Sequence, residues 1–134
     1  MSTTIEINLD LAPVACPRPR VSKNGVFYPK KYNTFREKSK ALLMNQCKMF
    51  IPKQQKLHIQ YKFVSRRQTN NCKGAGRQFK QTRPDLDNYI KAINDSLQSA
   101  GIIEDDSQIV MITAQKLFGD YKESGCIELQ IKFI

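Results

Sequence analysis

The stretch RPDLDNYIKAINDSLQSAGIIEDDSQIV, residues 83–110, decides the fold of this chain and carries half of its acidic side chains. Its apolar residues recur at helical spacing, at Leu86, Ile90, Ile93 and Leu97. Gly101 then stands where a helix C-terminal cap belongs. Beyond it, an apolar run predicts a strand over residues 109–116. The stretch therefore predicts a helix that leads through an acidic turn into a strand.

Outward from this stretch, apolar and polar residues alternate over residues 5–9, 57–63 and 127–133, which predicts three more strands. Thr34 and Glu37 have capping-box spacing, which predicts a helix over residues 35–50 that Pro52 closes. The dipeptide Asn24-Gly25 suggests a short hairpin in a basic, proline-rich segment. Residues 65–84 read as a long polar loop that is mobile without a ligand.

The order of these elements, β-α-β-α-β-β, predicts an α+β fold in a single domain over residues 1–134. We expect a mixed four-stranded sheet with two main helices packed on it. Because only a short turn separates the last two strands, we expect them to form an antiparallel hairpin.

The charge is distributed unevenly along the chain, whose net charge is +10. Residues 1–83 hold 18 Lys and Arg against three acids, a net +15, whereas residues 84–134 hold four against nine, a net −5. A cationic surface attracts polyanions, of which nucleic acid is the usual one. Carboxylates gathered in one short segment are of no use for binding phosphates, but they can hold a metal ion that helps to cut DNA.

No signal peptide and no apolar run long enough to span a bilayer is evident, so we expect a cytoplasmic protein without membrane contact. The four cysteines, Cys16, Cys47, Cys72 and Cys126, are scattered, and the chain has one histidine. This pattern argues against a structural zinc ion and favours reduced cysteines.

The candidate chemistry lies at the start of the helix in the opening stretch. Asp85 and Asp87 form an i,i+2 pair that can point toward one site, and Lys91 lies one turn after Asp87 on the same face. Asp105 and Asp106 follow the helix and join the site only if residues 101–106 fold back toward the helix start. Mg²⁺ prefers carboxylate oxygens, and a lysine can offset the charge that develops on a phosphate during hydrolysis.

Simpler interpretations stay open at this point. Asp85 or Asp87 can cap the helix, Asp87 and Lys91 can form an ordinary surface pair, and the acidic turn can be merely solvated. The chain could then be a non-catalytic module that binds branched DNA. A metal-dependent phosphatase for small substrates would explain the carboxylates but not the basic half.

The same residues resemble the RusA-type Holliday junction resolvases of bacteria and their phages. The family pattern R-x-D-L-D-N-x-x-K-A-x-x-D-x-L, followed by G-x-x-x-D-D-x-Q-[IV], matches residues 83–110. PRPRVSKNGVFYPKKYNTFRE, which begins at Pro17, is similar to the basic loop and first helix of phage-type members. The resemblance implies paired metal-binding aspartates at Asp85 and Asp87, a third at Asp106 with Asp105 as its less certain neighbour, and a catalytic lysine at Lys91.

The resemblance also implies a bacterial or phage-encoded homodimer that uses Mg²⁺ or Mn²⁺ to cut four-way DNA junctions by paired, symmetric nicks. Two matched incisions suit a twofold pair of sites. We expect phosphate contacts from the cations of residues 65–84 and of the basic N-terminal block. These residues are Arg18, Arg20, Lys23, Lys30, Lys31, Arg66, Arg67, Lys73, Arg77, Lys80 and Arg83.

Overall fold

The computed structural model describes residues 3–18 and 20–134, with only the backbone of Arg20. Its main sheet has five strands in the order β1-β7-β4-β6-β5. These strands are β1 (Thr4–Leu9), β4 (Leu57–Ser65), β5 (Gln78–Phe79), β6 (Ile109–Phe118) and β7 (Cys126–Phe133). β4 and β6 are parallel and all other neighbours are antiparallel, so the predicted mixed α+β sheet is confirmed, with the two-residue β5 as an additional strand.

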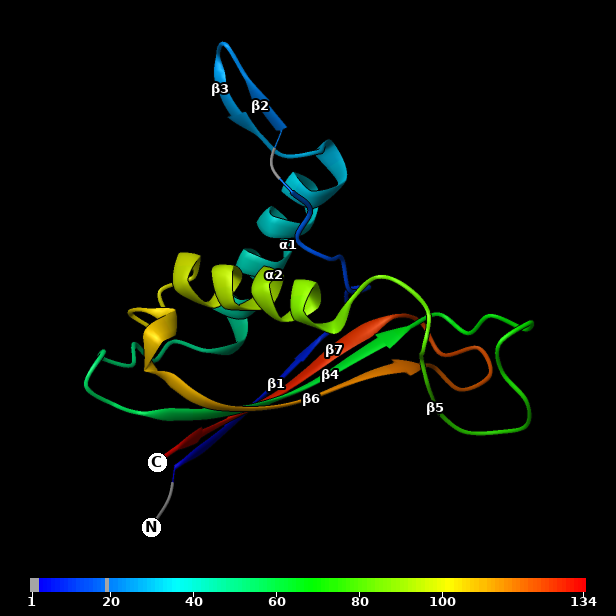
Figure 1. Ribbon diagram of the computed structural model, residues 1–134. Helices are drawn as coiled ribbons and strands as arrows, with labels where there is room; N and C mark the ends of the chain where they lie inside the picture. The colour runs from blue at the N-terminus through cyan, green and yellow to red at the C-terminus, as the bar shows by residue number, and fades with distance from the viewer. Residues whose placement is uncertain (1–2, 19) are drawn as a thin grey trace.

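Two helices, α1 (Lys30–Gln46) and α2 (Leu86–Ser99), cover one face of this sheet (Figure 1). α2 lies within the crossover that joins the parallel strands β4 and β6. The predicted hairpin is confirmed as a separate two-stranded sheet, β2 (Arg20–Ser22) and β3 (Gly25–Phe27), which projects away from the main body. Gly25 has a φ of 119°, a left-handed value that suits glycine at this turn.

The core lies between the sheet and the helices because alternate strand residues point toward them. The sheet contributes fully buried side chains such as Ile7, Leu57, Ile59, Tyr61, Phe63, Ile127 and Ile131. α1 contributes Tyr32, Phe35 and Leu43, and α2 contributes Tyr89, Ala92, Ile93 and Leu97. The Oγ atoms of Ser39 and Ser96 lie 2.8 Å apart in a buried hydrogen bond between the helices.

Two predictions about the elements are wrong. α1 begins five residues earlier and ends four residues earlier than expected, at Lys30 and Gln46. Thr34 therefore lies inside the helix and does not cap it; Pro29 is the N-cap residue. The last two strands do not form a hairpin, because β4 lies between them and pairs with both β6 and β7. The crossover through α2 returns β6 parallel to β4, which leaves the other side of β4 for β7.

Candidate active site

Asp85 and Asp87 lie at the start of α2 with exposed side chains. Asp85 occupies the N-cap position, with φ −70° and ψ 146°, but its side chain makes no capping hydrogen bond. The hypothesis that Asp85 serves as a side-chain cap is therefore wrong. In the part of the chain that the structure describes, neither carboxylate makes a hydrogen bond or an ion pair. Both remain available to a ligand.

The segment before Asp85 is held by a lysine from the sheet. Lys116 on β6 donates from its Nζ to the backbone oxygens of Thr82 and Pro84, at 2.9 and 2.8 Å. On the other side, the backbone N–H of Cys16 donates to the backbone oxygen of Asn88 at 2.9 Å. These bonds fix the start of α2 between β6 and the proline-rich segment.

Lys91 lies one turn further along α2, with 60% of its side chain exposed. Its Nζ is 3.8 Å from a carboxylate oxygen of Asp95, so its ion-pair partner is Asp95 and not Asp87. Such a long, exposed pair is weak. The ammonium group can therefore turn to a bound phosphate at little cost.

The acidic turn after α2 is rigidly held. Asp105 caps the short helix η1 (Asp106–Gln108) by accepting from the backbone N–H of Ser107 at 3.1 Å. Hydrogen bonds from the Ser107 side chain and backbone lower the pKa of the Asp105 carboxyl. The buried Gln108 side chain donates to the backbone oxygens of Pro52 and Gln55, at 3.0 and 3.1 Å. Asp105 is thus used in the turn, while Asp106 is exposed.

Within one chain, Asp106 does not approach Asp85 and Asp87. α2 has 14 residues, which corresponds to a length of about 20 Å. Asp85 and Asp87 lie at the start of this helix, whereas Asp106 comes after its C-terminal end (Figure 1). The backbone N–H of Ile51 donates to the Ile102 oxygen at 2.8 Å and holds the turn near the C-terminal end of α2. Residues 101–106 therefore do not fold back toward the helix start. Among the described residues, no three acidic, histidine or cysteine side chains are gathered as a metal site.

The predicted DNA-binding cations fall into two groups, and Arg20 lies outside them because its side chain is not described. One group is exposed and has no ion pair in the described ranges: Arg18, Lys23, Lys30, Lys31, Arg66, Lys73 and Arg83. The other group makes contacts within the chain. Arg67 donates to the backbone oxygens of Gly74 and Gly76 and lies 4.1 Å from the centre of the Tyr121 ring. Lys80 is buried.

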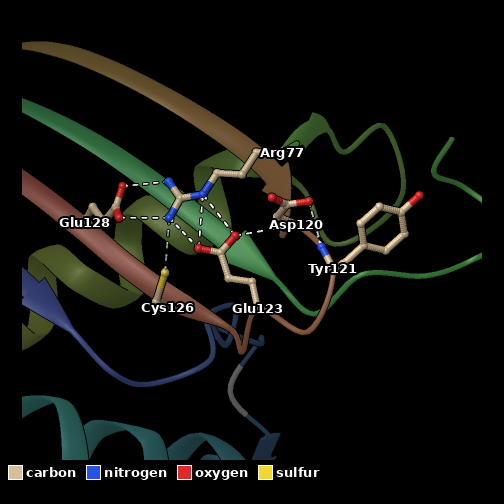
Figure 2. Close-up of polar contacts among 6 residues, drawn as sticks. All are labelled: Arg77, Asp120, Tyr121, Glu123, Cys126 and Glu128. Carbon is tan, nitrogen blue, oxygen red and sulfur yellow. Dashed lines mark hydrogen bonds and ion pairs between the residues drawn. The ribbon is translucent and has the colours of Figure 1, made fainter. Parts of the chain in front are cut away.

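Arg77 belongs to the second group and is bonded to two glutamates (Figure 2). Its guanidinium nitrogens lie 2.7 Å from Glu123 and 2.8 Å from Glu128 on β7. These hydrogen bonds hold the pKa values of both glutamates below their ordinary range. Asp120 also accepts from the backbone N–H of Gly76 at 2.8 Å, so contacts tie the 65–84 loop to the sheet instead of leaving it free. The structure thus gives Arg77 a role in anchoring this loop.

Lys116 and Gln108 were not identified as site residues from the sequence, although each had a signal. Strand alternation places Lys116 on the same face as Ile112 and Ala114, which is the face toward the helices. A lysine there needs buried partners. Gln108 lies in the matched motif, but its side chain donates hydrogen bonds to the backbone oxygens of Pro52 and Gln55. These residues are far from it in sequence, so no local pattern predicts the bonds.

The donor set at the start of α2 fits a magnesium ion. Mg²⁺ is commonly bound by one or two carboxylates, with waters and substrate phosphates as the remaining ligands. Asp85 and Asp87 supply two exposed carboxylates, and the positive end of the α2 dipole favours a phosphate there. A third carboxylate would have to come from outside this group.

The comparisons with known proteins concern the family of the chain and not its individual residues. The family model described as Endodeoxyribonuclease RusA matches residues 10–132, which is nearly the whole chain and includes every candidate residue of the site. Among curated proteins, no significant match is found. Neither helix in the described ranges is long and apolar enough to cross a membrane. The chain belongs to the RusA family of endodeoxyribonucleases, which act on Holliday junctions.

Proposed function

We propose that this protein is a magnesium-dependent, homodimeric resolvase that cuts Holliday junctions by paired, symmetric nicks. The observation that supports it best is the pair Asp85 and Asp87, which is exposed and makes no ion pair among the described residues. The pair follows a segment that Lys116 holds, in a chain that matches an endodeoxyribonuclease family. Asp85 and Asp87 would hold the ion, with Mn²⁺ as a substitute. A bound ion of this kind activates water and stabilises charge on the phosphate.

Lys91 is the proposed source of further positive charge. It lies on the face of α2 that carries Asp87, and its contact with Asp95 is weak enough to exchange for a phosphate oxygen. A cation at this position stabilises the negative charge that grows on the phosphate in the transition state. The exposed cations around the site, such as Arg66 and Arg83, would hold phosphates of the junction arms.

A homodimer would bring Asp106 of one copy near the Asp85 and Asp87 of the other, although these residues are far apart within one chain. β6 pairs with β4 along its length but with β5 only at Leu117 and Phe118, so residues 109–115 form an open sheet edge in the described structure. This edge carries exposed apolar side chains at Val110, Met111 and Ile112, with 55%, 54% and 44% exposure. An open apolar edge is unusual in a monomer and suits pairing with another strand.

Antiparallel pairing of two β6 edges around Met111 is a twofold arrangement. Asp106 lies five residues before Met111 and Lys116 lies five residues after it. Asp106 of one copy would therefore approach Lys116 of the other, which holds the segment next to Asp85. Each site would then take two aspartates from one copy and a third from its partner.

The test is cleavage of a synthetic, immobile four-way junction and a matched linear duplex by the wild type and Asp87→Asn, with Mg²⁺. We expect paired nicks in the junction alone, and a loss of at least about a hundredfold in the variant while junction affinity persists. Asp10→Asn, which neutralises an exposed acid outside the site, is the control and should cut normally.

The second candidate function is a module that binds branched DNA without cutting it, which the exposed cations alone would support. Tight junction binding by the wild type with no cleavage in Mg²⁺ or Mn²⁺ would establish that function and exclude the resolvase. Equal cleavage by Asp87→Asn and the wild type would remove Asp87 from the proposed mechanism.

A further inference from the structure

A cavity of about 540 Å³ lies beside the start of α2. Its wall is largely apolar and comes from the proline-rich segment and from Pro84: Ala12, Pro13, Val14, Ala15, Pro17 and Pro84. Lys31 and Arg66 add two exposed cations to the lining. Since Pro84 directly precedes Asp85, the cavity adjoins the candidate metal ligands.

One corner of this cavity contains a buried ammonium group. Lys80 is only 9% exposed, and its Nζ donates to the Ser65 Oγ at 3.0 Å and to the Tyr89 hydroxyl at 3.2 Å. All three residues line the cavity. The ammonium also lies 5.7 Å from the centre of the Tyr89 ring and 5.6 Å from that of Phe118. No carboxylate pairs with Lys80 in the described ranges.

This arrangement leaves capacity for an anion. A lysine ammonium has three donors, and the two hydroxyls accept two of them. A buried charge without a counter-charge is costly, and a ligand that brings a negative oxygen would reduce that cost. An apolar wall next to such a cation matches a ligand that is both apolar and anionic.

We propose that this cavity, the Lys80 pocket, binds one unpaired nucleotide of the branched DNA, an inference that rests on the proposed function. The phosphate would contact Lys80, with Arg66 and Lys31 nearby, while the sugar and base would pack on the proline-rich wall. The volume lies in the range of pockets that hold small ligands. Among the nucleotides of branched DNA, one that is already unpaired is the easiest to take out of the base stack.

The probe for this pocket is thymidine 5′-monophosphate, titrated into the full chain without metal or junction at physiological salt and followed by backbone amide NMR. We expect saturable shifts at residues that line the pocket, such as Ala15, Ser65 and Tyr89. Thymidine and inorganic phosphate, titrated separately, should each bind at least about tenfold more weakly, since each makes only part of the contacts.

Two variants and one control make the result specific. Lys80→Met removes the charge while keeping most of the side-chain volume, and Ala15→Trp places a bulky side chain in the cavity while Lys80 keeps its charge. Each variant should lower the affinity for the nucleotide by at least about tenfold, in a protein that keeps its amide spectrum. Lys53→Met, which removes an exposed lysine outside the pocket, should change nothing.

Equal binding of phosphate and nucleotide would overturn the proposal and leave a phosphate anchor only. Shifts that are absent, or that persist in both pocket variants, would also overturn it. Because the titration contains no metal and measures no cleavage, its failure leaves the role of Asp85 and Asp87 intact. Conversely, unchanged junction cleavage by Asp87→Asn would contradict the proposed role of Asp87 but would leave the result of the nucleotide titration as it is.

Discussion

At the scale of single residues, Lys116 connects the sheet to the candidate metal ligands. Its ammonium group donates to the oxygens of Thr82 and Pro84 and so fixes the backbone that leads into Asp85. The contact is through backbone oxygens, so the identity of residues 82 and 84 gives no hint of it in the sequence. Lys116 is therefore a positioning residue, distinct from the aspartates that would touch the ion.

Lys116→Met should lower the rate of junction cleavage by about ten- to a hundredfold, because small displacements of reacting groups are that costly. Junction affinity should change less than about twofold, since Lys116 is half-buried and bonded within the chain. Single-turnover cleavage and a gel-shift titration measure the two quantities. Lys116→Arg can still donate to both oxygens and should restore most of the rate.

Lys62→Met is the matched control, because Lys62 is an exposed lysine on the neighbouring strand and its neighbours Tyr61 and Phe63 are buried on the opposite face. It should cut as the wild type does. If Lys116→Met also cuts at the wild-type rate, the two bonds to the segment before Asp85 do not position the site.

At the scale of elements, the sequence predicted well what depends on local periodicity. α2 and the long strands were placed to within about two residues, because buried side chains recur at their own spacing along each element. The start of α1 was missed because the Thr34–Glu37 spacing satisfies a capping pattern inside a helix whose buried face already includes Tyr32. Strand order was missed because the Gly119–Gly125 turn does not determine which strand lies next to β4.

The 65–84 loop offers a prediction at this scale, since Arg77 joins it to β7 through Glu128. Arg77→Met should lower the free energy of unfolding at pH 7 by about 1 kcal/mol, the upper end for exposed ion pairs, because the guanidinium bonds two carboxylates. Urea unfolding followed by circular dichroism measures it. Arg66→Met, which removes an exposed arginine that makes no ion pair with the described residues, should have almost no effect on stability.

The effect of Arg77→Met should depend on pH. The folded-state pKa values of Glu123 and Glu128 are lowered, so the stability that the network contributes is present above their unfolded values and is lost as the pH falls through the folded ones. The unfolded values are near 4.5. The stability difference between wild type and Arg77→Met should therefore be complete at neutral pH and shrink below this value. A difference that stays constant down to the acid limit would mean that Arg77 acts through packing alone.

At the scale of the whole molecule, the arrangement of the site could not be predicted from local patterns. Asp85 and Asp87 are close in sequence, so their proximity required only the start of α2. The place of Asp106 depends on the length of α2 and on the contacts of Ile51 and Gln108, which join segments about 50 residues apart. The structure places Asp106 at the C-terminal end of α2, away from Asp85 and Asp87. Asp106 can therefore join the other two aspartates only if a second copy of the chain supplies it.

Mixing two inactive variants tests whether the site is shared between two copies. If Asp106 acts on the partner's site, a dimer of Asp87→Asn with Asp106→Asn has one doubly altered site and one intact site. Co-expression with two affinity tags and purification through both isolates this mixed dimer. It should nick junctions singly at about half the wild-type rate, because one of two sites works.

The control is a mixed dimer of Asp85→Asn with Asp87→Asn, in which both sites carry one change whichever arrangement holds, and it should stay inactive. If the dimer of Asp87→Asn with Asp106→Asn is equally inactive while the doubly tagged wild type cuts, Asp106 does not complete the partner's site. The open edge of β6 would then need another explanation, and the metal site would consist of Asp85 and Asp87 with oxygens from water and DNA.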